Sequence, residues 1–260
     1  MVSVLANAAE LQGSFERSAA LYALEQQLAD GVGDQLGQCW AAGGKAMLAI
    51  RRGDFDEAVT QARLAQGLAL ATGEAVSYLA DSGLLALALF ERGDFDAARA
   101  LLDEGLSIMA TLPRLATAHH LLNGLDTFSE LTLRFWEREA PPPGSAAWKS
   151  WSGHATLANT STNGYARMFA IGAPMAAQRV ALQHWLCGRR SKALAAWRHA
   201  IAEGERTAIP YETAKAHLEL ARHLSADDPQ LHVHAARAAT LFGQLGAHAG
   251  LRQAQALSQA

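Results

Sequence analysis

The sequence predicts an all-α protein built as a solenoid of antiparallel helix pairs with a period of about 40 residues. The segments RRGDFDEAV and ERGDFDAAR place Gly53 and Gly93 forty residues apart, and LQGSFERSA places Gly13 one period earlier. A fixed period of this length is typical of helical repeat arrays. Apolar residues also recur three and four positions apart, as at Leu84, Leu87 and Ala88, and no alternating strand pattern occurs.

The Gly-Asp pair is expected to lie in the turn between the two helices of a repeat. Glycine can end a helix in a left-handed conformation at little cost. The carboxylates of Asp54 and Asp94 can then cap the helix that follows. Phe55 and Phe95 begin that helix and are expected to pack back against the preceding one. The small residues Ala58 and Ala98 lie one turn later and allow close helix approach.

The helix pattern and its breakers give the order of elements. Helices are expected at about 2–12, 15–29, 33–52, 55–71, 74–92 and 95–110, and a long one at about 114–139, opened by Pro113. The segment APPPGSAAWKSW then breaks the array, because three prolines cannot continue a helix. Helices are expected again at about 153–171, 174–187, 190–207, 210–224 and 229–245, with Asp228 as cap and Pro229 in the first helical position, and from about 247. The sequence thus predicts two subarrays, 1–139 and 153–260, joined by a Pro-rich linker at 140–152.

The GDFDEA segment resembles the GDYEEA segment of the tetratricopeptide repeat, whose helix pairs stack into a right-handed superhelix. That family has a small residue seven positions before the glycine. This chain has Ala6, Ala46 and Ala86 there, and Ala181 in a later copy, WLCGRRSKALAAW. The later copy is degenerate, because Arg190 replaces the phenylalanine. The period also exceeds the family's standard length of 34 residues, which implies longer helices.

The final third resembles the last repeats of large bacterial signalling proteins. The segments AIPYETAKAHLELARHL and DDPQLHVHAARAATLFGQLGA carry this resemblance. In such proteins an AAA-type ATPase module, often behind a nucleotide cyclase, kinase or DNA-binding domain, precedes a tetratricopeptide tail. The resemblance implies a bacterial, cytoplasmic interaction or regulatory domain in signal transduction.

The family resemblance also assigns residues to a concave groove formed by the first helix of each pair. The groove positions are Trp40, Gly43, Met47 and Ile50, then Ala80, Gly83, Leu87 and Phe90, and in the later copy Met175, Gln178, Leu182 and Trp185. They are apolar, whereas a groove that reads acidic peptide tails would present Lys, Arg and Asn. The expected partner is a protein or peptide segment with apolar side chains, or an adjacent domain of a larger chain. A change of Phe90 to lysine is expected to weaken partner binding and leave helicity intact.

Three alternatives remain open at this stage. The groove can be filled by the array's own segments, for instance the linker at 140–152, because an apolar face is costly to leave in water. The chain can be a small-ligand sensor of the maltose-activator kind, with Trp40, Trp185 and Gln178 in its pocket. It can also be a self-association scaffold in which the apolar face buries against another copy, giving a homo-oligomer.

No catalytic or cofactor motif is present, so the sequence predicts a non-enzyme without a metal or cofactor. It has neither a phosphate-binding glycine loop nor a nucleophile elbow. Adjacent His119 and His120 point to different faces of a helix, and His232 and His234 are poorly spaced for shared metal ligation. His217 and His223 are expected on a helix surface or end. The net charge of −3 without basic blocks argues against nucleic acid, and GLLALALF is too short to span a membrane.

The remaining chemistry-bearing side chains have structural interpretations. Cys39 and Cys187 fit two buried thiols in a reducing compartment. The tryptophans at 136, 148 and 151 bracket the Pro-rich break and are expected to pin it onto the array, and Trp197 is expected in the core.

Overall fold

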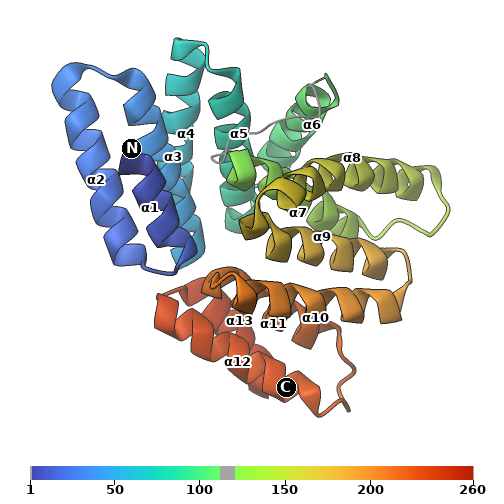
Figure 1. Ribbon diagram of the computed structural model, residues 1–260. Coiled ribbons are helices and arrows are strands. Elements are labelled where there is room, and N and C mark those ends of the chain that lie inside the picture. Colours follow the sequence, from blue (N-terminus) through green and yellow to red (C-terminus); the bar gives the residue numbers. More distant parts are fainter. Residues whose placement is uncertain (1, 112–120, 260) are drawn as a thin grey trace. The chain divides into compact units, whose positions relative to one another are not determined.

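The computed structural model describes residues 2–111 and 121–259, and within these ranges every regular element is a helix (Figure 1). The chain divides into two compact units, Met1–Leu131 and Thr132–Ala260. The first contains α1 (Val2–Leu11), α2 (Phe15–Val32), α3 (Gln35–Arg52), α4 (Phe55–Thr72), α5 (Ala75–Arg92), α6 (Phe95–Thr111) and the start of α7 (Leu121–Glu139). The second contains the rest of α7, α8 (Ala146–Met168), the 3-10 helix η1 (Ala170–Gly172), α9 (Ala173–Leu186), α10 (Arg190–Arg206), α11 (Pro210–His223), α12 (Gln230–Leu245) and α13 (His248–Gln259).

Consecutive helices pack against each other in both units, which confirms the predicted all-α repeat architecture. In the first unit α1 also contacts α3, and α3 contacts α5, so the first helices of successive pairs lie side by side. In the second unit α11 contacts both α9 and α13 in the same way. The small residues predicted at helix contacts, Ala6, Ala46, Ala86, Ala181, Ala58 and Ala98, are all fully buried.

The turns of the first unit recur every 20 residues, half the period seen in the sequence. Glycine with positive φ stands at 13, 33, 53, 73 and 93. After each glycine the next backbone N–H donates to a carbonyl five residues back, as from Asp54 to Ala49 at 2.9 Å and from Asp34 to Ala29 at 2.9 Å. These are Schellman turns, which satisfy the last carbonyls of a helix. Helices α2 to α5 therefore each have 18 residues and are joined by two-residue turns.

Two sequence predictions fail at these turns. The helix expected at 15–29 continues to Val32, and Gly33, expected at the start of a helix, ends it with φ 70°. Asp34 then caps α3 by accepting hydrogen bonds from the N–H groups of Leu36 and Gly37, each at 3.1 Å. The connection between repeats is thus the same kind of turn as the one within a repeat.

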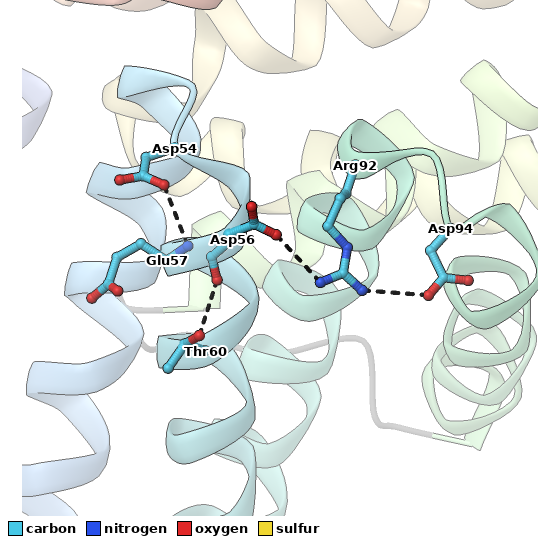
Figure 2. A network of polar contacts seen from close by, with 6 residues as sticks. All are labelled: Asp54, Asp56, Glu57, Thr60, Arg92 and Asp94. Carbon is cyan, nitrogen blue, oxygen red and sulfur yellow. Dashed lines mark hydrogen bonds and ion pairs between the residues drawn. The ribbon is translucent and has the colours of Figure 1, made fainter.

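Figure 2 shows the polar contacts around two of these turns. Asp54 caps α4 as predicted by accepting from the Glu57 N–H at 3.4 Å. The structure gives no such contact for Asp94, which instead accepts from Arg92 at 3.5 Å. Arg92 also pairs with Asp56 at 3.5 Å, and forty residues earlier Arg52 pairs with Glu16 at 3.5 Å. These exposed ion pairs repeat with the array and stabilise it little.

A substitution at Gly93 tests the importance of the left-handed turn. Gly93→Val is expected to lower stability by about 1–2 kcal/mol or more, because an L-residue is strained at φ 92°. Gly67→Ala is a matched control, since Gly67 lies inside α4 with nothing within 4 Å of an added Cβ. The control is expected to be neutral or stabilising. Urea midpoints of the two variants measure the difference, and equal midpoints would contradict the role of the turn.

The Pro-rich break is shorter than predicted. Residues 140–145 are non-helical, but α8 begins at Ala146, seven residues before the predicted 153, because the Ser145 hydroxyl accepts from the Trp148 N–H at 3.1 Å. Helix α8 then ends at Met168 and η1 follows, where the sequence predicted one helix to 171. The helix predicted at 114–139 is observed from Leu121, and its first part lies outside the described residues, as do Pro113, His119 and His120.

Near the C-terminus, the predicted cap is correct and the helix start differs by one residue. Asp228 accepts from the Gln230 N–H at 2.9 Å, and α12 begins at Gln230 with Pro229 just before it.

Helix α7 is held against both of its neighbours in the first unit by glycines. An added Cβ at Gly124 would lie 2.3 Å from the Ala80 Cα, so α7 and α5 touch through their backbones. The Phe128 ring of α7 covers Gly105 of α6, and a Cβ added at Gly105 would lie 2.2 Å from this ring. Glycine is required at these positions because any larger residue would separate the helices.

Candidate functional site

The nine residues predicted to bind a partner in the groove lie on three helices. Trp40, Met47 and Ile50 are on α3, Leu87 and Phe90 on α5, and Met175, Gln178, Leu182 and Trp185 on α9. Seven of the nine side chains are buried. The two exceptions are Trp40, which is 37% exposed, and Trp185, which is partly exposed. The predicted apolar groove therefore consists largely of core residues, and only two aromatic side chains reach solvent.

Phe90 shows why the groove positions are buried. Its ring packs edge-on against Phe95 with centroids 5.1 Å apart, so it closes the core of the turn between α5 and α6. The expectation that lysine at position 90 leaves the fold intact does not fit this burial, because the ammonium group would have to enter the core.

Trp185 belongs to an aromatic cluster in the second unit, which we define as Trp185, Arg190, Trp197 and His223. The His223 ring contacts both indoles, with its centroid 4.6 Å from that of Trp185 and 4.3 Å from that of Trp197, and the two indoles lie 6.1 Å apart. The Arg190 guanidinium lies over the Trp185 ring, 4.1 Å from its centroid. Helices α9, α10 and α11 supply these residues. The cluster runs from the buried Trp197 to the exposed Arg190.

Two glutamates contact His223 in this cluster, one through its backbone carbonyl and one through its carboxylate. Its Nδ1 lies 2.7 Å from the Glu219 carbonyl oxygen and must donate to it, since a carbonyl only accepts. Its Nε2 lies 3.7 Å from the Glu137 carboxylate of α7. A hydrogen bond from His223 lowers the pKa of Glu137. His223 is the last residue of α11, in agreement with the expectation of a helix surface or end, and it is buried inside the cluster.

Gln178 and Glu212 form a second buried polar contact in this unit. The Gln178 amide donates to the Glu212 carboxylate at 3.0 Å and to its backbone carbonyl at 3.3 Å. Both side chains are buried. The Gln178 Oε1 atom has no hydrogen-bond partner within the described part of the chain. This amide can therefore accept one further hydrogen bond.

His217 and His234 pair across α11 and α12. Their Nδ1 atoms lie 2.8 Å apart, so one imidazole donates and the other accepts. Burial, with the charges of His234 and Arg237, lowers the pKa of His217 to about 4, and burial also lowers the pKa of His234. His217 is buried rather than on the helix surface. Among the described residues no group of three or more His, Cys, Asp or Glu side chains could hold a metal ion.

The histidine pair predicts a loss of stability at acidic pH. The unfolded chain binds more protons than the folded chain between pH 6.5 and about 4, so the contribution of His217 is present above pH 6.5 and is lost as the pH falls through this range. His217→Gln is expected to flatten this part of the stability profile, and His232→Gln, an exposed change on α12, is expected to leave it unchanged. Melting temperatures from pH 7.5 to 4.5 measure the difference.

The wild-type profile must be subtracted from that of each variant, because Asp81 acts with the opposite sign. Burial raises its pKa from 3.8 to about 7, so its carboxyl group favours the folded state as the pH falls through that range. A His217→Gln profile parallel to that of the wild type would contradict the role of the histidine pair.

In the first unit the buried thiol of Cys39 contacts Asp81. Its Sγ lies 3.3 Å from the Asp81 carboxylate and 3.4 Å from the Ala65 carbonyl oxygen. Burial, together with the adjacent acid, raises the pKa of Cys39. The thiol is therefore protonated at neutral pH and is a poor nucleophile.

The tryptophans near the Pro-rich break join α7 to α8. Trp136 packs edge-on against Trp148 at 5.5 Å, and Phe135 stacks on Trp151 at 6.3 Å. The Trp151 indole donates to the Glu139 carboxylate at 2.8 Å. These rings fix to each other the two helices on either side of the break.

The chain was compared with protein-family models and with curated proteins. No protein-family model matches the chain, and no curated protein matches it significantly. Among the described residues, no helix is both long and apolar enough to cross a membrane.

Proposed function

We propose that this chain is a non-catalytic interaction or regulatory domain of the tetratricopeptide type, which binds a protein segment with apolar side chains. Support comes from the stacked helix pairs with their repeating glycine turns and buried alanines. In keeping with the sequence resemblance, we place it in the cytoplasm as part of a bacterial signalling ATPase. The binding surface we propose is smaller than the groove expected from the sequence.

The pairing of Trp185 with Arg190 carries this proposal. Tryptophan and arginine are the residues that most often dominate binding at protein interfaces. Trp185 is partly exposed, and its ring is fixed by contacts with Arg190 and His223, so it loses little conformational entropy on binding. A partner can contact the guanidinium and the free edge of the indole without any rearrangement of the core.

Capture experiments with paired variants test this function. The wild-type chain, Arg190→Glu and Trp185→Ala are immobilised and exposed to lysate from the source organism, and bound proteins are quantified by mass spectrometry. A partner bound through the cluster is retained by the wild type and lost by both variants. Arg252→Glu, an exposed change on α13, is the control and is expected to retain it. If the wild type and all three variants capture the same proteins equally, the proposed binding surface is wrong.

Circular dichroism must accompany these experiments, because Trp185 also contacts His223 and Trp197. Arg190 is exposed, and its replacement is expected to leave the melting temperature within about 2 °C, as surface changes usually cost less than about 0.5 kcal/mol. Arg190→Glu thus reports on binding even if Trp185→Ala loosens the core.

The Gln178 amide favours a second candidate, a small-ligand sensor. Gln178, Leu182 and Trp185 occupy positions i, i+4 and i+7 of α9 and so share one helix face. A small polar ligand could donate to the unpaired Oε1 of Gln178 and contact the indole. Metabolite pools that raise the melting temperature of the wild type but not of Gln178→Leu would support the sensor, whereas equal shifts would exclude this site.

A further inference from the structure

The turn between α9 and α10 carries three exposed cations, Arg189, Arg190 and Lys192, which we call the basic turn. Within the described residues, none of the three forms an ion pair with an acidic side chain. Arg206 at the other end of α10, by contrast, pairs with Glu203 at 2.6 Å. The basic turn is therefore a concentration of positive charge that the second unit itself does not neutralise.

Backbone geometry places the basic turn beside Trp185. Gly188 follows α9 with φ 73°, and the Arg189 N–H then donates to the His184 carbonyl oxygen at 2.9 Å. This Schellman turn folds the chain back, so Arg189 and Arg190 lie next to the last turn of α9. The Arg190 guanidinium accordingly lies over the Trp185 ring.

The charges of the basic turn act on the end of α9. Burial lowers the pKa of His184, and the charges of Arg189 and Lys192 lower it further. Both cations therefore lie close enough to His184 to disfavour another positive charge at this place. An anion at the same place would be stabilised.

The sequence explains why these cations are unpaired. Between Glu139 and Glu203 it contains no Asp or Glu, so α8, α9 and most of α10 supply no carboxylate. Glu203 stands near the far end of α10, a helix of 17 residues and about 25 Å in length. The charge of −3 for the whole chain conceals this local excess of cations.

The acids that other helices bring to the aromatic cluster are already engaged. Glu219 of α11 pairs with Arg222 at 2.7 Å, and Glu137 of α7 lies 3.7 Å from His223. Neither forms an ion pair with Arg190. A carboxylate that neutralises the basic turn is therefore one supplied by another molecule.

The contact with Trp185 prepares Arg190 to bind such a carboxylate. A guanidinium that lies over an aromatic ring is held in place and keeps N–H donors, which match the two oxygens of a carboxylate. The partly exposed indole beside it offers an apolar contact. An ion pair and an apolar contact are thus available at one place.

We propose that the protein segment bound at Trp185 is acidic, with an apolar side chain on the indole and Asp or Glu carboxylates paired with the basic turn. This inference rests on the proposed binding site at Trp185 and adds the charge of its partner. Nucleic acid fits the site less well, because its affinity comes from many phosphates along an extended cationic track. Here three cations converge beside an apolar ring, and the chain as a whole repels a polyanion.

Selection from a library of random displayed peptides tests the charge of the partner. Peptides selected on the wild-type chain are expected to be enriched in Asp and Glu next to Phe, Leu or Trp. On Arg189→Gln combined with Lys192→Gln, the acidic enrichment is expected to disappear while the apolar residues remain. Fluorescence anisotropy of one selected peptide is expected to show about threefold to tenfold weaker binding to this double variant, because each exposed ion pair contributes modestly.

Arg167→Gln combined with Arg252→Gln is the matched control, since it removes two exposed cations from α8 and α13. It is expected to bind the selected peptide as the wild type does. Equal weakening by the two double variants would overturn the proposal, because the effect would then follow the net charge and not the basic turn.

The remaining outcomes separate this inference from the proposed binding site. Selected peptides that need Trp185 but show no acidic preference would overturn the inference and leave the site standing. Peptides that bind Trp185→Ala as they bind the wild type, or a selection without any binding peptide, would overturn both. A single-stranded DNA oligonucleotide that binds the wild type more tightly than the selected peptide, and is lost with Arg189→Gln and Lys192→Gln, would also overturn the acidic segment.

Discussion

Replacing Arg51 with methionine is expected to destabilise the first unit by about 3–5 kcal/mol, the largest effect we predict for a single charge in this chain. The Arg51 guanidinium lies 3.0 Å from the Glu10 carboxylate, and the two side chains are 2% and 0% exposed. Removing the arginine takes this cation away from a carboxylate that is buried in the core. The penalty comes from this buried charge and far exceeds the value of the ion pair itself.

The adjacent arginine offers a matched control. Arg52 pairs with Glu16 at 3.5 Å, but Glu16 is largely exposed, so Arg52→Met is expected to cost at most about 1 kcal/mol. The double change Arg51→Met with Glu10→Leu is expected to recover most of the lost stability, because apolar residues often replace a buried ion pair without net cost. Urea denaturation measures the free energy of unfolding of the wild type, the two single variants and the double variant. Equal losses for Arg51→Met and Arg52→Met would contradict the burial of the pair.

Trp197→Ala is expected to destabilise the second unit by about 3–5 kcal/mol, because it deletes a fully buried indole. The ring stacks on His223 and lies 6.1 Å from Trp185, so the cavity would open beneath the whole aromatic cluster. Trp185 would then lose its fixed position. We therefore expect partner binding at the cluster to weaken together with stability.

A conservative change separates packing from hydrogen bonding at this position. The Trp197 Nε1 atom is buried and has no hydrogen-bond partner within the described part of the chain. Trp197→Phe removes this unpaired donor and keeps an aromatic ring, so it is expected to cost less than half as much as alanine. Trp40→Ala, at a partly exposed tryptophan of the first unit, is the control. Similar midpoints for Trp197→Ala and Trp40→Ala would show that the cluster is not part of the core.

The turns were the most predictable part of this fold, because their signals are local. Gly53 is followed by an aspartate and a phenylalanine that repeat at Gly93, and the pattern identified both turns, the alanine contacts and the cap at Asp54. Gly33 and Gly73 form the same turn, but Asp34 and Glu74 follow them without an aromatic residue. The backbone conformation is the same at all of these turns, whereas the side chains that follow the glycine differ between them. The sequence period consequently identified three of these five turns, at Gly13, Gly53 and Gly93.

The binding site was much less predictable, because burial depends on contacts between distant segments. The register assigned Met47, Leu87 and Leu182 to a groove, and apolar side chains at such positions fit a binding surface or a core equally well. Their burial follows from the packing of whole helices. His223 likewise joins Trp185 and Trp197 across gaps of 38 and 26 residues, which no local pattern reports.

The 20-residue spacing of the turns also constrains how such a chain can change in length. Every helix runs opposite to the one before it, so the loss of one helix and its turn would reverse the direction of all the helices that follow. The loss of two restores the direction and shifts the array by one full repeat. Viable length variants are therefore expected to differ by multiples of 40 residues, although the turn itself recurs every 20. The first unit can thus keep its helix directions only if helices are lost or gained in pairs, because the same turn reverses the chain at Gly13, Gly33, Gly53, Gly73 and Gly93.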